Sequence, residues 1–291
     1  MNLRERVITS LEERREKVLS GSVNCIPSPL TRFREDFVGI EQGRYYLVSA
    51  SQKCGKTQFT SYIFIYEALW FCYKNPDKAH IKIFYFPLEE SPEEILLRYM
   101  SFILFKLSDG KYRVSTSDLK STDERKILSE EVLTLLKSPQ YTELLQYFEE
   151  HVTFMDSRNP TGAWKSVINY AESHGTIHYK TYQYKDSLTG EMKSSRKFDY
   201  YEPNDPSEYV EIIWDHAGLT EQERGMDLRQ SINKLSEYFV LLRNLYNYIP
   251  ILIYQQSTET QNLEAFKNNK IKASVSGLSD SKYPARDLPY N

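Results

Sequence analysis

The sequence predicts an α/β fold with a mainly parallel sheet flanked by helices. Short apolar runs alternate with helical stretches from residue 44 onward, which is the pattern of βαβ units. These runs are nearly continuous, as in strands that are buried on both faces of a parallel sheet. A loop at residues 50–57 follows the first run and leads directly into a helical stretch. A loop between a strand and a helix is where such a sheet commonly binds an anion.

The chain is expected to begin with a helix over residues 1–20, which ends at Gly21. Four apolar side chains recur there at helical spacing among many charged ones. Because this apolar stripe is narrow, two interpretations stay open: the helix docks on a neighbouring subunit, or it lies on its own domain. The four side chains are Leu3, Val7, Leu11 and Val18.

Five strands and four helices are expected after this first helix. Short runs rich in β-branched and aromatic residues predict the strands, at residues 44–49, 81–86, 152–155, 209–214 and 250–254. Longer periodic stretches predict the helices, at residues 57–73, 92–107, 161–173 and 226–248.

Two segments look inserted into this alternation. Residues 108–150 contain a polar stretch followed by helical patterns, and residues 176–206 alternate polar and aromatic residues around a turn at residues 189–190. The second pattern predicts an exposed β-hairpin. Its side chains either stack on bases and contact phosphates, or form a solvated ribbon whose tyrosines pack across the strands. They are Tyr179, Lys180, Tyr182, Tyr184, Lys185, Lys193, Arg196 and Lys197.

Composition excludes several classes of protein. The 291 residues carry 37 Lys and Arg against 40 Asp and Glu, so no global positive field attracts nucleic acid. The longest apolar stretch, residues 62–73, is far shorter than the ~20 residues that span a bilayer, so no contact with a membrane is expected. The charged N-terminus lacks the apolar core of a secretory signal. Three cysteines without paired spacing predict free thiols, and hence a cytoplasmic protein.

The strongest motif is the loop after the first strand. It fits the phosphate-loop pattern, with alanine in place of the first glycine. Its backbone N–H groups and the following helix N-terminus are expected to converge on an anion. ATP and Mg²⁺ are the expected ligands, with the lysine on the β- and γ-phosphates and the threonine hydroxyl on the metal. The loop consists of Ala50, Ser51, Gln52, Lys53, Cys54, Gly55, Lys56 and Thr57.

Three further strands end in polar residues at the same expected edge of the sheet. Asp215 is expected to organise Mg²⁺, although without the phosphate loop it would be interpreted as a cap. Glu89 is the better candidate for a base that activates water, because Glu90 fits a first-turn acid that stabilises a helix dipole. The last strand ends in Gln255 and Gln256, and a glutamine there either senses the γ-phosphate or is only a polar strand end.

The order of these motifs resembles the RecA-like ATPase domain of DnaB-type replicative helicases, including phage versions. The family motifs concerned are an "FFSLEMS…R" segment, an "IVIDY" Walker B strand, an "ALSQ" segment and a "DLRESG…DAD" stretch. They correspond here to residues 83–91 with Arg98, residues 212–216, residues 253–256 and residues 277–287, and residues 26–43 resemble the approach to the family's first strand.

The resemblance implies roles for single residues. Glu89 would be the catalytic base, Asp215 the Walker B residue, and Gln256 the sensor that couples hydrolysis to DNA. The loops at residues 217–227 and 257–276 would face the channel of a ring and bind single-stranded DNA, although their basic residues alone are also typical of a solvated loop. The DNA-binding candidates are Arg224, Lys267, Lys270 and Lys272.

The resemblance also implies a domain organisation. Residues 1–20 would be a linker helix that docks on the next subunit of a hexameric ring, and residues 21–291 a RecA-like ATPase domain. Two departures are expected: no primase-binding domain precedes the helix, and the chain ends before the last strands of the family, so the arginine finger is unassigned. A primase or a loader therefore stays open as a partner.

The expected function is that of an ATP-dependent replicative DNA helicase motor. It would hydrolyse ATP and translocate on single-stranded DNA as a ring, in the host cytoplasm if the chain is phage-encoded. Two alternatives stay open. One is a RecA/RadA-like recombinase or loader ATPase, and the other is a nucleotide-switched assembly protein without unwinding activity.

Overall fold

A five-stranded parallel sheet forms the centre of the fold. The computed structural model describes residues 2–185, 190–257 and 274–288. The strand order is β3-β9-β8-β4-β5, and every neighbouring pair is parallel. All five predicted strands are confirmed, and the fold class is the predicted α/β one. The strands are β3 (Tyr46–Ala50), β4 (His80–Pro87), β5 (Val152–Phe154), β8 (Glu208–Asp215) and β9 (Ile249–Gln255).

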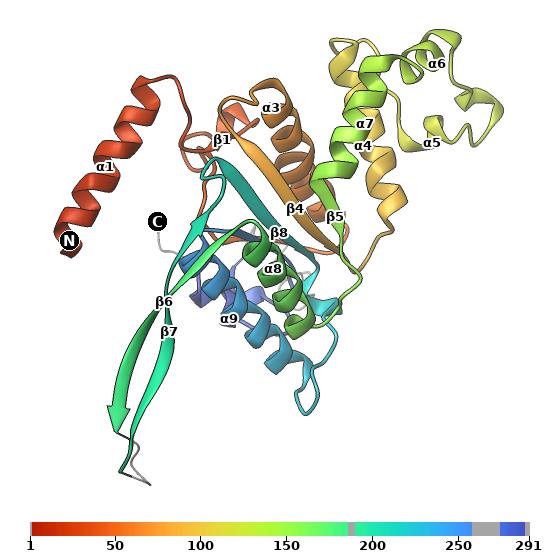
Figure 1. The fold of residues 1–291 in the computed structure, drawn as a ribbon. Coiled ribbons are helices and arrows are strands. Elements are labelled where there is room, and N and C mark those ends of the chain that lie inside the picture. Colours follow the sequence, from red (N-terminus) through yellow and green to blue (C-terminus); the bar gives the residue numbers. More distant parts are fainter. Residues whose placement is uncertain (1, 186–189, 258–273, 289–291) are drawn as a thin grey trace.

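Successive side chains of each central strand enter two different cores, one on each face of the sheet. On β4, Ile83 and Tyr85 belong to one core, whereas Phe84 and Phe86 belong to the other. Because both faces are covered, the strands are apolar at nearly every position. The first core is closed by α3 (Ala68–Lys74), α4 (Pro92–Leu107) and α7 (Pro139–His151), and the second by α8 (Pro160–Ser173) and α9 (Leu228–Tyr246) (Figure 1).

The helix after the phosphate loop differs from the predicted single helix over residues 57–73. It begins as α2 (Lys56–Thr60), continues as a π-helical segment, η2 (Ser61–Glu67), and ends as α3. Four consecutive η2 side chains, from Ile63 to Tyr66, are buried. A helix that is apolar on all sides gives no clear periodicity, which is why the sequence does not reveal the wider π turn.

The other three predicted helices, α4, α8 and α9, are confirmed. Each begins at a polar side chain that accepts a hydrogen bond from a first-turn N–H group, and two of them have proline at the first turn. Such caps satisfy N–H groups that have no partner within the helix. The capping residues are Ser91, Asn159 and Asp227.

Short elements complete the described chain. Residues 108–150 contain the expected helical segments, which pack beside α4 (Figure 1). They are α5 (Thr116–Leu119), η3 (Glu124–Lys126), α6 (Glu130–Leu136) and α7. The remaining elements are β1 (Ile26–Pro27), η1 (Thr31–Phe33), β2 (Gly39–Ile40), η4 (Ala217–Leu219), η6 (Val275–Gly277) and α11 (Tyr283–Arg286). None of the helices in the described part of the chain is long and apolar enough to cross a membrane.

The first helix, α1 (Leu3–Leu19), lies to one side of the body (Figure 1). An ion pair of 2.9 Å joins Arg14 to Glu41 of the body. Val7, Leu11 and Val18 are at least half exposed on this helix. The predicted helix is therefore confirmed, and its apolar stripe does not pack on its own domain at these three positions.

The predicted hairpin is confirmed as β6 (Gly175–Lys185) and β7 (Met192–Pro203), an antiparallel ribbon that projects from the body (Figure 1). Of the predicted turn, Thr189 lies outside the described residues, and Gly190 adopts a positive φ of 72°. A positive φ is strained for most residues but not for glycine.

Candidate nucleotide-binding site

The phosphate loop joins the carboxyl end of β3 to the N-terminus of α2. Gly55 is the N-cap residue with φ +79°, and Lys53 also has a positive φ, of 59°. The first N–H groups of α2 have no partner within the helix and carry the positive end of its dipole. The ammonium group of Lys56 donates a 3.0 Å hydrogen bond to the carbonyl oxygen of Ser51 and so lies over the loop. The loop therefore has the geometry of an anion site.

A pocket of about 300 Å³ opens beside this loop. Its volume is at the lower end of the range for small-molecule sites. The pocket brings together the loop and the ends of β4 and β9, which are far apart in the sequence. Its lining residues are Gln52, Lys53, Gly55, Lys56, Thr57, Gln58, Glu89, Glu90 and Gln255.

Asp215 at the end of β8 is almost completely buried, with 1% of its surface exposed. The hydroxyl of Tyr85 donates a 2.9 Å hydrogen bond to its Oδ2, whereas its buried Oδ1 has no hydrogen-bond partner among the described residues. Burial raises the pKa of this carboxyl, and the hydroxyls of Tyr85 and Thr57 beside it oppose the shift. A buried carboxylate oxygen without a partner, next to a threonine hydroxyl, fits the oxygen ligands that Mg²⁺ prefers. These two side chains would hold the metal in the way that the sequence predicts.

The two acids after β4 have different surroundings. Glu90 forms an ion pair with Arg98 of α4, so its charge is already compensated. Glu89 is about half exposed on the pocket side, and the imidazole of His216 lies 3.8 Å from its carboxylate. Glu89 is therefore the acid that is available to a bound water molecule.

The two glutamines after β9 also differ. Gln255 lines the pocket, whereas Gln256 is only 3% exposed. The amide nitrogen of Gln256 donates to the hydroxyl of Ser49 at 3.0 Å and to the carbonyl oxygen of Ser274 at 3.2 Å. Gln256 therefore joins the strand before the phosphate loop to the segment that follows residues 258–273.

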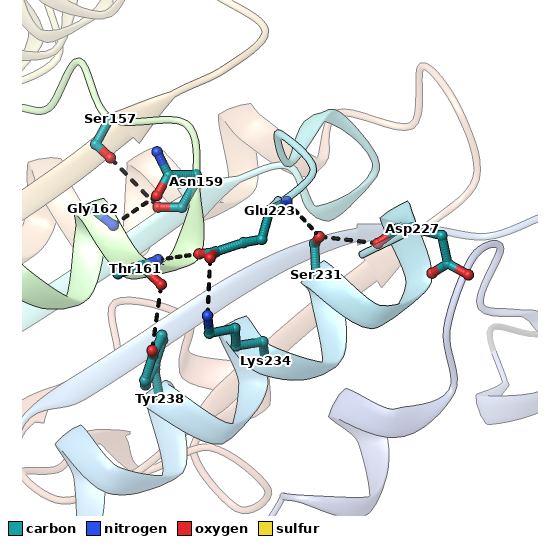
Figure 2. A network of polar contacts seen from close by, with 9 residues as sticks. All are labelled: Ser157, Asn159, Thr161, Gly162, Glu223, Asp227, Ser231, Lys234 and Tyr238. Carbon is teal, nitrogen blue, oxygen red and sulfur yellow. Dashed lines mark hydrogen bonds and ion pairs between the residues drawn. The ribbon is translucent and has the colours of Figure 1, made fainter. Parts of the chain in front are cut away.

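The loop after β8 contains Arg224, whose side chain is exposed. The neighbouring Glu223 fixes this loop between two helices (Figure 2). Its carboxylate accepts hydrogen bonds from the N–H group of Thr161 on α8, at 2.6 Å, and from the ammonium group of Lys234 on α9, at 2.9 Å. Its own N–H group donates to the hydroxyl of Ser231 at 3.0 Å. Although burial raises the pKa of Glu223, the hydrogen bonds from Thr161 and Lys234 outweigh it, and the pKa is lowered.

The remaining DNA-binding candidates, Lys267, Lys270 and Lys272, lie outside the described residues. The structure does bring together Lys56, Thr57, Glu89 and Asp215 around the phosphate loop. Gln256 is buried and does not line that pocket, and its amide group contacts Ser49.

Sequence reasoning missed two residues that shape this site. Tyr85 holds Asp215, and Glu223 fixes the following loop. Of the two glutamines that the sequence places at the last strand end, Gln255 is the one that lines the pocket. Tyr85 lies within an apolar strand, where a tyrosine is typical of the core. Its one distinguishing feature is its position two residues before Pro87, which is the register partner of Asp215. This position brings its hydroxyl close to the Asp215 carboxylate. For Glu223 the sequence contains no comparable signal.

The class of protein follows from the fold and the loop: a RecA-like α/β fold with a phosphate loop at the carboxyl edge of its sheet. A solved DnaB-like replicative helicase, whose structure is described with its interactions with primase, has a similar fold, with a TM-score of 0.61 and 15% sequence identity. The match covers 99% of this chain and 55% of that chain, so this chain spans about half the length of that helicase. No family model and no curated protein matches the chain. The comparison therefore shows that this chain and the DnaB-like replicative helicase share their fold over nearly the whole of this chain.

Proposed function

We propose that this chain is the ATP- and Mg²⁺-dependent motor domain of a replicative DNA helicase. It hydrolyses ATP and translocates on single-stranded DNA as a ring, in the cytoplasm. The observation that carries this proposal is that Lys56, Thr57 and Glu89 line one pocket at the carboxyl edge of the sheet, while the buried Asp215 lies next to Thr57.

Each residue has a role that its surroundings support. Lys56 supplies a positive charge to the β- and γ-phosphates from its position over the loop. Thr57 and Asp215 hold Mg²⁺, with Tyr85 fixing one oxygen of the carboxylate and leaving the other for the metal. When bound, the ion neutralises the charge that develops on the phosphates during transfer.

Glu89 is the proposed general base. Its carboxylate lines the pocket and forms no ion pair with a lysine or arginine of the described residues, so it can accept a proton from the attacking water. Glu90 lies next to it in the sequence but is neutralised by Arg98. The two acids therefore form a matched pair in which only the first is expected to act in catalysis.

Gln256 is the proposed coupling residue. Its amide group contacts both Ser49, immediately before the phosphate loop, and Ser274, immediately after residues 258–273. A movement of the phosphate loop on hydrolysis would reach the second segment through this side chain. Arg224, Lys267, Lys270 and Lys272 are the residues proposed to contact the DNA phosphates.

Assembly and partners belong to the same proposal. The exposed stripe of Val7, Leu11 and Val18 on α1 supports docking on the next subunit of a hexameric ring. The similar helicase is described with its interactions with primase, and a primase or a loader is proposed as a partner here.

The test is ATP hydrolysis measured with and without single-stranded DNA, at moderate salt. Wild type is expected to be stimulated by DNA. Lys56→Ala is expected to lose ATP binding, whereas Glu89→Gln should bind ATP but lose about 10²-fold or more in turnover, the usual contribution of a general base. Glu90→Gln is the control and should retain much more turnover than Glu89→Gln.

Particle shape separates the proposal from the recombinase or loader alternative. Closed rings in negative-stain images with ATP support the helicase, whereas open helical filaments favour a recombinase. Tight ATP binding without turnover, with or without DNA, would contradict the motor and favour a nucleotide switch.

A further inference from the structure

The base of the hairpin packs into the second core. Phe198 and Tyr201 of β7 lie 5.6 Å and 5.2 Å from the ring of Tyr246, which ends α9. Tyr201 also meets Tyr248 edge-on, with ring centroids 6.1 Å apart. Such aromatic contacts contribute beyond the area that they bury, so the base fixes the direction in which the distal half projects (Figure 1).

Two tyrosines in the distal half lie on one face of the ribbon. Tyr182 and Tyr184 are two residues apart on β6, which places their side chains on the same side of the strand. Their ring centroids are 6.2 Å apart, and they are 47% and 44% exposed. Two large aromatic rings are therefore presented to solvent side by side.

The strand register explains why these rings are not needed to hold the ribbon together. Residues directly opposite one another in an antiparallel pair share a face. Tyr182 faces Ser195 and Tyr184 faces Lys193, and neither partner is an apolar side chain. Tyr179, by contrast, faces Phe198. An aromatic partner across the strands is therefore available to Tyr179 but not to the distal pair.

Lysines flank the exposed pair on the same face. By the register, Lys180 and Lys197 lie opposite each other on the body side of Tyr182, and Lys193 lies opposite Tyr184. All three side chains are exposed. Lys180 forms an ion pair of 2.6 Å with Asp199, at the end nearer the body. The face thus combines stacking surfaces with cations that can contact phosphates.

We propose that this distal hairpin face, defined by Tyr182, Tyr184 and Lys197, binds single-stranded nucleic acid without sequence preference. Aromatic faces bind bases of any identity when those bases are unstacked, and lysines follow the phosphate backbone. A duplex keeps its base faces covered, so the tyrosine pair favours a single strand. The contact is additional to the DNA loops of the proposed motor and does not involve the ATP pocket.

The test is fluorescence anisotropy of labelled oligo-dT and oligo-U with the full chain, without nucleotide. The double variant Tyr182→Ala/Tyr184→Ala is expected to bind both oligonucleotides at least about tenfold more weakly, as for the loss of stacked bases. Tyr182→Phe/Tyr184→Phe should bind like wild type, because it keeps the rings. Tyr179→Ala, which removes a tyrosine from the other face, is the control and should lose little.

A second pair of variants tests the charges. Lys197→Ala is expected to reduce the slope of log affinity against log salt by about 0.7, the contribution of one phosphate contact on a single strand. Its neighbour Arg196 lies on the opposite face of the ribbon, so Arg196→Ala should leave the slope unchanged.

Three results would overturn the proposal. One is unchanged single-strand affinity in the double alanine variant. Another is a loss of affinity that is confined to duplex DNA. The third is unchanged affinity per subunit with a lower oligomeric mass, which would make the face a protein contact. Because ATP hydrolysis with and without single-stranded DNA is measured in parallel, failure of this proposal is distinct from failure of the motor function. An intact, DNA-stimulated ATPase with an inert hairpin contradicts only the hairpin site.

Discussion

Tyr85 on β4 donates a 2.9 Å hydrogen bond to Asp215 on the neighbouring strand β8, in a fully buried environment. This contact occupies one oxygen of the carboxylate and leaves the other without a partner among the described residues. The oxygen that is proposed to bind Mg²⁺ thus belongs to a carboxylate that is oriented by a residue outside the pocket lining. Groups that orient metal ligands in this way commonly change metal affinity when they are lost.

Tyr85→Phe is therefore expected to raise the Mg²⁺ concentration needed for half-maximal ATP hydrolysis by about tenfold or more. The measurement is turnover against MgCl₂ at saturating ATP. Tyr99→Phe is the matched control, because the hydroxyl of Tyr99 is also buried but has no partner among the described residues. An identical magnesium dependence in both variants would mean that Tyr85 does not position Asp215.

Substitutions of the two glutamines after β9 are expected to separate ATP binding and hydrolysis from the coupling of hydrolysis to DNA. Gln255→Ala changes a residue that lines the pocket, and it should weaken ATP binding or turnover even without DNA. Gln256→Met keeps the volume but removes the hydrogen bonds to Ser49 and Ser274. It should retain hydrolysis without DNA and lose stimulation by single-stranded DNA. If both variants lost only the DNA-independent activity, Gln256 would not be a coupling residue.

The sheet and the phosphate loop could be predicted because buried parallel strands have a local signature. Each is a short apolar run, and Asp215 and Glu89 follow two of these runs at positions that chain order alone identifies. Such a pattern is formed by residues that are neighbours in the chain, so it can be recognised from the sequence alone.

The supporting contacts could not be predicted, because they depend on the pairing of distant strands. Tyr85 meets Asp215 only because β4 and β8 are adjacent in the sheet, and Gln256 meets Ser49 only because β9 lies beside β3. The resemblance selects Gln256 as the sensor, whereas the pocket is lined by Gln255, and the sensor role of Gln256 stays a prediction. The sequence likewise gives no indication that the side chain of Glu211, which lies within a strand, is fully buried.

Glu223 is expected to support both stability and the loop that contains Arg224. Glu223→Gln removes a charge that accepts from Thr161 and Lys234, and hydrogen bonds to charged groups contribute about 1.5–3 kcal/mol. Because the pKa of Glu223 is lowered in the folded state, this stability is present above the pKa of about 4.3 in unfolded chains and is lost as the pH falls through the folded pKa.

Thermal unfolding of wild type and Glu223→Gln at neutral pH and at successive pH values from about 4.3 downward, below the unfolded pKa, checks this expectation. The two melting temperatures should differ at neutral pH and converge on acidification, with DNA stimulation reduced in the variant. Glu221→Gln is the control, because Glu221 is an exposed acid of the same loop. A difference that persists unchanged at low pH would mean that the charge of Glu223 is not what stabilises the loop.

Glu211 in the centre of β8 is expected to make the stability of the protein fall as the pH rises. Its side chain is fully buried, neither carboxylate oxygen has a hydrogen-bond partner among the described residues, and burial raises its pKa well above the usual range. Below about pH 4.3 the group is protonated in both states. Above that pH the unfolded chain releases a proton that the folded chain retains, so unfolding becomes easier by up to about 1.4 kcal/mol per pH unit until the folded group ionises.

Glu211→Gln cannot titrate, and its stability relative to wild type should therefore increase with pH when chemical unfolding is followed from pH 5 to pH 8. Glu149→Gln, at an exposed position on α7, should not show this trend, and parallel pH profiles for wild type and Glu211→Gln would contradict a protonated Glu211.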